Sequence, residues 1–206
     1  MRKIYLLLIA FFAFSNSYSQ EVYFLTGTNI TKYTYSSDQG SMSTPLLAGI
    51  GSNFEMGYTR PLKNKRFSHT VGINLNDYNA IAGNNANSYK WTTKYIGVNN
   101  SLDLSVPLSK NFKLFFKAGV NLSTIIYGKQ ESNGAIYDLV SKDEFSGLVF
   151  VPYTGLHLKY KVKELGYLSF GYGLSKSLIL FNISSEKLTT STNQILFGIH
   201  FNINKK

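Results

Sequence analysis

The stretch FKAGVNLSTII, from Phe116 to Ile126, alternates between two kinds of side chain. Neighbouring residues of a β-strand point to opposite faces. One face of this segment would therefore carry small and polar groups, and the other would carry mostly apolar ones. The two sets are Gly119, Asn121 and Ser123 against Ala118, Val120, Leu122 and Thr124. The pattern predicts a strand that separates two different environments.

The same glycine-led step returns along the chain. It is found as GTNIT, GINLN, GLHLK and GIHFN, which begin at Gly27, Gly72, Gly155 and Gly198. The chain also contains 15 Tyr and 15 Phe, which favour strands, and period two recurs where a helical period does not. We therefore predict eight strands: Val22–Tyr33, Leu46–Thr59, Phe67–Asn79, Trp91–Val106, Phe112–Tyr127, Leu148–Val162, Gly166–Phe181 and Asn193–Ile203.

The connections between these strands alternate strictly between short and long. The short ones are residues 60–66, 107–111 and 161–166, and the long ones are residues 35–44, 79–90, 128–147 and 182–190. In an antiparallel array this alternation places every long loop at one end, as in outer-membrane barrels. A sandwich with Greek-key crossings would not alternate so regularly. The predicted fold class is all-β, an eight-stranded antiparallel up-and-down transmembrane β-barrel.

The orientation of the two faces follows from the glycines. Glycine weakens an exposed strand, whereas inside a narrow barrel it makes room for large polar neighbours. We therefore expect the polar set to line the lumen and the apolar set to face lipid. Glu55, Asp103 and Lys117 then lie inside, where we expect contacts between opposite charges and with nearby tyrosines. The predicted lumen polar cluster is Glu55, Asp103, Lys117, His157 and His200, and Lys159 shares its face.

The N-terminus has the pattern of a secretory signal peptide. Arg2 and Lys3 precede an apolar run from Ile4 to Phe14, which is about half the roughly 20 residues that a spanning helix needs. Cleavage is expected near Ser19 or Gln20. The expected domains are a signal peptide at residues 1–20 and an outer-membrane barrel at residues 21–206. The chain has no cysteine, so disulfides and thiolate sites are excluded.

The formal net charge is +10, and removal of Arg2 and Lys3 lowers it to +8. A basic chain can bind nucleic acid or an anionic membrane surface. Export argues against nucleic acid, and the densest basic groups fall in the predicted short turns. We interpret them as solvated turn charges.

The chain resembles the small outer-membrane β-barrel family common in Bacteroidota. The resemblance rests on the signal ending SYSQ, the Pro-Leu turns, the Gly-x-Asn-Leu strands and the closing ILFGIHFNI, and it covers essentially the whole mature chain. It implies an eight-stranded barrel with a polar interior in the bacterial outer membrane. Most members of that family have no assigned activity, although some relatives serve in secretion or in contact with a host.

No motif predicts catalysis, a cofactor or a metal site. The three histidines are His69, His157 and His200, and a serine or acidic partner, Ser175 or Asp103, would be needed to activate a nucleophile. Eight strands enclose only enough space for side chains, which argues against a wide pore. Trp91, Tyr89 and Tyr95 resemble one interfacial aromatic belt, with Tyr58, Phe67, Phe112 and Tyr167 as its counterpart near the turns.

The leading hypothesis is a non-enzymatic outer-membrane barrel with a structural, adhesion or partner-binding role through its long loops. Its expected partners are outer-membrane lipid and an extracellular or envelope protein, the latter at loop 129–145, with no nucleic acid. One alternative is an outer-membrane lipid-modifying hydrolase or acyltransferase. Another alternative is a soluble secreted barrel that binds an apolar ligand.

Overall fold

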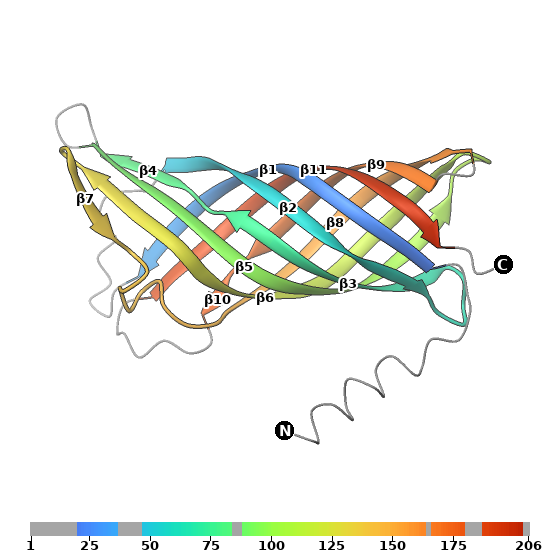
Figure 1. Ribbon diagram of the computed structural model, residues 1–206, viewed down its shortest axis with the longest axis horizontal. Coiled ribbons are helices and arrows are strands. Elements are labelled where there is room, and N and C mark those ends of the chain that lie inside the picture. Colours follow the sequence, from blue (N-terminus) through green and yellow to red (C-terminus); the bar gives the residue numbers. More distant parts are fainter. Residues whose placement is uncertain (1–19, 37–46, 84–87, 164–165, 180–186, 204–206) are drawn as a thin grey trace, which may run out of the picture.

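The structure is a computed structural model that describes residues 20–36, 47–83, 88–163, 166–179 and 187–203 (Figure 1). It consists of long strands wound around one axis, and the first and last described residues, Gln20 and Ile203, lie opposite each other at the same end. The long strands are β1 (Gln20–Ser36), β2 (Leu47–Pro61), β3 (Phe67–Asp77), β5 (Ser88–Pro107), β6 (Phe112–Ser132), β8 (Val149–Val162), β9 (Gly166–Lys176) and β11 (Lys187–Ile203). The short strands are β4 (Ala80–Gly83), β7 (Ala135–Asp138) and β10 (Leu178–Ile179).

The eight long strands form a closed ring. Each pairs antiparallel with the next, in the order β1, β2, β3, β5, β6, β8, β9 and β11. β11 then pairs with β1 over its whole length, from Gln20 opposite Ile203 to Ser36 opposite Lys187. This closure confirms the predicted eight-stranded antiparallel up-and-down barrel. Closure also removes the sheet edges that would leave backbone groups unpaired in hydrocarbon.

The wall has an apolar outer face and a polar inner face, as the glycine argument predicts. On β1, Phe24 is 48% exposed and the adjacent Leu25 is 4% exposed. Buried polar side chains come from the inner face, and they include Asn29, Thr31, Asn53, Asn74, Asn76, Asn99, Ser101, Asp103, Asn121, Ser123 and Thr192. Exposed large side chains of the outer face include Ile50, Phe54, Met56, Ile73, Val98, Leu122, Leu156, Phe170, Phe197 and Ile199. A belt of this kind is stable against lipid, which confirms the transmembrane orientation.

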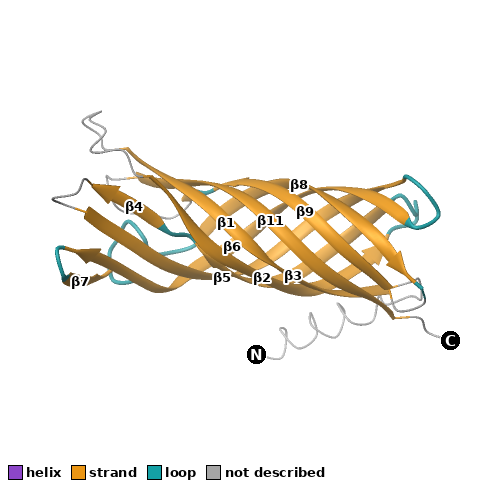
Figure 2. Cartoon of the chain, turned by 90° about the horizontal axis from the view of Figure 1, so that it is seen from above, coloured by secondary structure: helices purple, strands orange, loops and turns teal. Residues whose placement is uncertain are grey.

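The short connections β2–β3, β5–β6 and β8–β9 lie together at one end, which we call the turn end. The described parts of the longer connections lie at the opposite end, the loop end, as Figure 2 shows for β4 and for the β6–β7 hairpin. Among the described residues, no helix is long and apolar enough to cross a membrane. The predicted signal peptide falls on residues outside the described ranges, apart from Gln20, the first residue of β1.

Several strand ends differ from the sequence prediction. β6 continues to Ser132, five residues beyond the predicted end at Tyr127, because it forms a hairpin with β7. The hairpin turn uses Asn133 at φ 47° and Gly134 at φ 81°. Two successive residues with positive φ are the geometry of a tight hairpin turn that matches strand twist. β9 ends at Lys176, earlier than the predicted Phe181, which lies outside the described residues.

The lumen-facing glycines explain the pattern that returns along the chain. A side chain at Gly72 would collide with the hydroxyl of Tyr23, which reaches this position from β1, two strands away. A Cβ at Gly171 would lie 2.7 Å from ring atoms of His157. The absence of a Cβ at each of these glycines therefore leaves room for a large polar neighbour inside the narrow barrel.

Candidate functional site

The turn end of the lumen holds a group of charged side chains. We call it the turn-end cluster, and it consists of Glu21, Tyr23, Glu55, Asp103, Lys117, His157, Lys159, Ser169 and His200. Alternation places these residues on the inner faces of β1, β2, β5, β6, β8, β9 and β11. Asp103, Lys117, His157, Lys159 and His200 are each less than 10% exposed. Charges this deep need partners, because burial of an isolated charge is costly.

Glu21 is the centre of one half of this cluster. Its Oε1 lies 2.5 Å from the Nζ of Lys159 and 2.6 Å from Nδ1 of His200. The other ring nitrogen of His200, Nε2, lies 2.8 Å from Oγ of Ser169. Serine, histidine and glutamate therefore stand in one hydrogen-bonded row, and a lysine shares the carboxylate. Glu21 and Ser169 were not among the residues predicted to form the lumen cluster.

The other half is built on Glu55 and Asp103. Tyr23 donates its hydroxyl to Oε1 of Glu55 at 2.6 Å, and Asn99 donates to the same oxygen at 2.9 Å. Asp103 accepts hydrogen bonds from Thr70 and Ser101, each at 2.9 Å. Both carboxylates are thus held by neutral donors.

Lys117 lies over the ring of Tyr23, with its Nζ 5.6 Å from the ring centroid. No ion pair within 4.0 Å joins Lys117 to Glu55 or Asp103, so the expected direct contact between opposite charges is wrong. The expected tyrosine contact is present, between Tyr23 and Glu55. The physical reason is that hydroxyl and amide donors already occupy these carboxylates, so the lysine makes a cation–π contact instead.

Amide side chains fill the middle of the lumen. Asn76 accepts from Asn29 at 3.0 Å and from Asn53 at 2.6 Å, and donates to Asn74 at 2.9 Å. Asn74 in turn donates to Asn121 at 3.1 Å. The residues belong to four different strands, β1, β2, β3 and β6, so the network links parts of the wall that are not adjacent in the sheet. A small cavity of about 30 Å³ adjoins it, lined in part by Tyr153 and Gln194.

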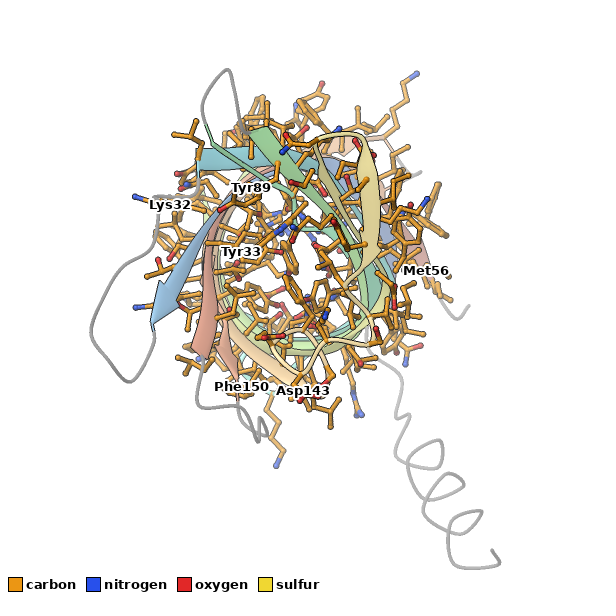
Figure 3. All side chains as sticks on the ribbon, turned by 90° about the vertical axis from the view of Figure 1, so that its left-hand side faces the viewer. Lys32, Tyr33, Met56, Tyr89, Asp143 and Phe150 are labelled. Carbon is orange, nitrogen blue, oxygen red and sulfur yellow. The ribbon has the colours of Figure 1, made fainter. Side chains whose placement is uncertain are left out.

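The loop end is closed by apolar and aromatic side chains, which we call the aromatic plug. Its members are Tyr33, Tyr78, Ala80, Tyr95, Ile125, Leu139, Phe145 and Leu188, with Tyr89, Trp91 and Val149 packed against them. Phe145 lies 5.2 Å from Trp91 between ring centroids, with the two rings nearly perpendicular. Trp91 meets Tyr33 in the same manner at 5.3 Å. Figure 3 looks into this end and shows Tyr33 within the ring of strands.

The plug corrects the predicted aromatic belt. Trp91 and Tyr95 belong to the plug inside the mouth and do not form a belt around the outside. Tyr167, assigned to the opposite belt, lines the turn-end opening, where its hydroxyl lies 3.4 Å from the Nζ of Lys113. Phe67 and Phe112 do face outward, at 40% and 39% exposure. Sequence alternation alone could not separate a mouth residue from an interface residue.

The longest loop divides into two parts. The β6–β7 hairpin rises beyond the barrel mouth, and at its end Ile136 and Tyr137 are 62% and 52% exposed. The returning segment enters the mouth, where Leu139 and Phe145 are 3% and 5% exposed. Asp138 joins the parts, because its carboxylate accepts hydrogen bonds from the backbone of Val140 and Ser141.

Hydrogen bonding at this junction has an electrostatic consequence. The side chain of Ser141 and the backbone N–H groups lower the pKa of Asp138 below its usual value. The carboxylate therefore stays ionised and holds the hairpin's return turn.

The lumen contains little free space. At the turn end an opening of about 120 Å³ is lined by polar groups that include Lys65, Lys113 and Lys159. Deeper in the cluster, a cavity beside His157 and His200 measures about 10 Å³. An apolar hollow of about 650 Å³ lies on the outer wall, bordered by Phe24, Phe54 and Phe197. These cavities in the described lumen are too small for the apolar ligand that a soluble ligand-binding barrel would hold.

The histidines do not form the nucleophile arrangement considered from sequence. His69 lies on the outer face and meets Asn100 at 3.1 Å. Ser175 stands opposite Tyr153, whereas His157 stands opposite Gly171, so Ser175 and His157 are not in register. The described residues contain no group of three or more His, Cys, Asp or Glu side chains that could hold a metal ion.

The chain is similar to several small outer-membrane proteins of known structure. Neisserial surface protein A is 13% identical, with 87% of this chain and 97% of that chain covered and a TM-score of 0.49. Ail, the attachment invasion locus protein of Yersinia pestis, is 13% identical, with 89% and 100% covered and a TM-score of 0.39. The translocator domain of the autotransporter NalP from Neisseria meningitidis is 9% identical, with 97% and 94% covered and a TM-score of 0.38.

No family model matches the chain, and no curated protein matches it either. The fold is established by the strand pairings and by the burial pattern of the wall.

Proposed function

We propose that this chain is a non-enzymatic protein of the bacterial outer membrane, which displays the β6–β7 hairpin to a protein partner outside the cell. The proposal includes removal of a signal peptide near Ser19 or Gln20. It also includes the narrower assignment to the small barrel family common in Bacteroidota, which the sequence motifs favour.

The membrane assignment is supported by the wall. The eight long strands contain from 11 to 21 residues, and a tilted spanning strand needs about 9–11. Closed barrels are the only sheets that satisfy all backbone groups in hydrocarbon. The test is fractionation of cells that express the full chain, followed by electrophoresis with and without heating. Recovery in the outer membrane with heat-dependent migration supports the proposal, and recovery in the soluble fraction contradicts it.

The partner-binding role is supported chiefly by the construction of the long loop. The hairpin continues β6 without interruption, so the rigid wall holds it in position. Its return segment is anchored in the mouth by Leu139 and Phe145. Ile136 and Tyr137 remain exposed on this support, and a rigid aromatic side chain is a frequent anchor in protein interfaces. β7 pairs with β6 and with no other described strand, so it also offers a free edge.

A photocrosslinking residue in place of Tyr137 tests this role in intact cells. The matched control carries the same residue in place of Lys32, an exposed outward position on β1 near the same end (Figure 3). The proposal predicts a discrete adduct between the chain and a cellular or envelope protein from position 137, which is absent from position 32. Equal adducts from both positions, or none from position 137, would contradict the role of the hairpin.

The row formed by Ser169, His200 and Glu21 favours a second candidate function, acyl transfer or lipid hydrolysis. The geometry matches a nucleophile, a base and an orienting carboxylate. However, the carboxylate is shared with Lys159, and the free space beside His200 is about 10 Å³. The backbone N–H groups of the strands lie in the plane of the sheet and are engaged in the ladders with neighbouring strands, so they form no oxyanion site.

A fluorophosphonate probe, which labels activated serines, separates the two candidates. The leading proposal predicts no labelling of the folded protein and an unchanged lipid profile in cells that carry Ser169→Ala. Labelling that is lost in Ser169→Ala but retained in Ser175→Ala would instead establish the hydrolase.

A further inference from the structure

Positive charge is concentrated at the turn end of the barrel. Eight basic side chains surround this opening, and Glu21, which is already paired with Lys159, is the one carboxylate among the described residues that line it. Glu55 and Asp103 lie deeper in the lumen, where neutral donors hold them. The basic residues, which we call the basic rim, are Arg60, Lys63, Lys65, Arg66, Lys110, Lys113, Lys161 and Lys163. Glu164, in the β8–β9 turn, lies outside the described residues. The charge of the described residues is therefore unevenly distributed between the two ends.

The loop end is nearly balanced by comparison. Its described charges are six lysines and five carboxylates, namely Lys32, Lys90, Lys94, Lys129, Lys142 and Lys176 against Asp77, Glu131, Asp138, Asp143 and Glu144. Solvation of turns would not favour one sign at one end, because Asp and Glu are solvated equally well. The asymmetry therefore points to a partner of negative charge at the turn end.

The position of the rim relative to the apolar wall identifies that partner. Exposed apolar side chains stand directly beside the basic ones along the chain: Phe67 follows Arg66, and Tyr160 precedes Lys161. The rings of Phe112 and Tyr160 lie 5.0 Å apart on neighbouring strands and form part of the outward border. Aromatic side chains mark the level of the lipid headgroups, and the flexible stems of lysines reach from there toward phosphate groups.

We propose that the basic rim binds the headgroups of anionic phospholipids in the membrane leaflet at the turn end. The rim side chains at positions 63, 65, 66, 110, 161 and 163 are exposed, and the described residues place no carboxylate within 4.0 Å of them. The binding is electrostatic and spread over three turns, so it recognises negative charge at the headgroup level and not one lipid species. This lipid contact is independent of the protein partner proposed for the hairpin.

Spin-labelled lipids test the proposal directly. The full chain is reconstituted in phosphatidylcholine vesicles, and the motionally restricted fractions of spin-labelled phosphatidylglycerol and phosphatidylcholine are compared. One lysine or arginine at an anionic surface favours association by about fivefold, so we expect at least a severalfold preference for phosphatidylglycerol. Higher ionic strength should weaken this preference, since the rim is exposed to solvent.

Two matched variants place the preference on the rim. The first combines Lys63→Gln, Lys65→Gln and Arg66→Gln, and its control combines Lys90→Gln, Lys142→Gln and Lys176→Gln, with the same loss of charge at the loop end. We expect the rim variant to lose most of the preference and the control to keep it. If the first variant does not fold, the pair Lys110→Gln and Lys161→Gln in the other turns decides the question, with a partial loss expected.

Three results would overturn the proposal. The first is equal restriction of the two lipids by the unmodified protein. The second is a preference that survives in the folded rim variants or falls equally in the loop-end control. The third is a lipid preference that inorganic phosphate abolishes at constant ionic strength, because that result would show that the rim residues form a binding site for small anions.

Discussion

The two ends of the lumen are filled by opposite chemistry inside one continuous wall. At the turn end, carboxylates, lysines and histidines occupy the interior, with Glu21 between Lys159 and His200. At the loop end, the interior is occupied by aromatic rings, with Trp91 between Tyr33 and Phe145. The wall strands supply the whole of the first group, whereas a loop segment supplies Leu139 and Phe145 of the second. The difference indicates that the turn-end cluster belongs to the barrel itself, and that the plug is closed by the loop that returns into it.

This contrast has consequences for stability. A buried ion pair contributes little when both partners are present, but the loss of one partner leaves an uncompensated charge. An aromatic cluster responds instead to the volume that is removed. Substitutions at the turn end should therefore lower the free energy of global unfolding, whereas substitutions in the plug should mainly weaken the docking of the loop.

Removal of Glu21 should have the largest effect. Glu21→Ala leaves Lys159 buried without its carboxylate, and breaking such a pair costs about 3–5 kcal/mol. The free energy of unfolding, measured by urea titration in lipid vesicles, reports this loss. The double variant Glu21→Gln with Lys159→Gln should recover part of it, because neither charge is then left alone. A double variant that is as unstable as the sum of its single variants would contradict the pairing.

Removal of Phe145, the ring that the loop contributes to the plug, should come next. Phe145→Ala leaves an empty site beside Trp91 and Tyr33. Loss of a buried phenyl group costs about 3 kcal/mol, and here we expect most of that loss to weaken the docking of the loop in the mouth. The chain contains a single tryptophan, so the emission of Trp91 reports the plug alone. We expect a shift to longer wavelength as water enters. Leu148→Ala, at an exposed site next to the loop, is the control, and the same shift there would contradict the plug.

A methyl group at Gly72 should produce an intermediate effect. Gly72→Ala places its Cβ against the hydroxyl of Tyr23 and disturbs the bond from Tyr23 to Glu55, at a cost of about 1–3 kcal/mol. At Gly173 the added carbon would lie 3.2 Å from the flexible end of Gln194, so Gly173→Ala should be milder. Addition of Tyr23→Phe should relieve the collision at Gly72. Equal losses in both alanine variants would show that crowding by Tyr23 is not the reason for the glycine.

The smallest effect is expected at the exposed ion pair of the loop end. Lys94 and Asp77 lie 3.3 Å apart, with side chains 42% and 21% exposed. Such pairs contribute about 0.2–1 kcal/mol and are screened by salt. Lys94→Gln should therefore change the free energy of unfolding by less than a third of the change in Glu21→Ala, and only at low ionic strength. If Lys94→Gln destabilised the protein as much as Glu21→Ala does, burial could not explain the difference between the two ion pairs.

The sequence was sufficient to predict the wall but not all of its filling. Alternation around residues such as Gly119 and Asn121 predicts both the strands and their orientation, because a strand has only two faces. Glu21 was missed because it directly follows the predicted cleavage site. The sequence of its own strand also does not show that Lys159 of β8 and His200 of β11 lie next to it. Phe145 was missed as a plug residue because a loop has no period, so an aromatic residue in it gives no direction. Ser132 extends β6 beyond the apolar belt, where the alternation of polarity is lost.

The orientation of the wall is the central claim, and a cysteine scan along β11 tests it most directly. The chain has no cysteine, so single cysteines from position 195 to position 201 can be spin-labelled without interference. In lipid vesicles, collisions with oxygen, which is concentrated in hydrocarbon, should be frequent at positions 195, 197, 199 and 201 and rare at 196, 198 and 200. The opposite alternation, with frequent collisions at positions 196, 198 and 200, would contradict the account.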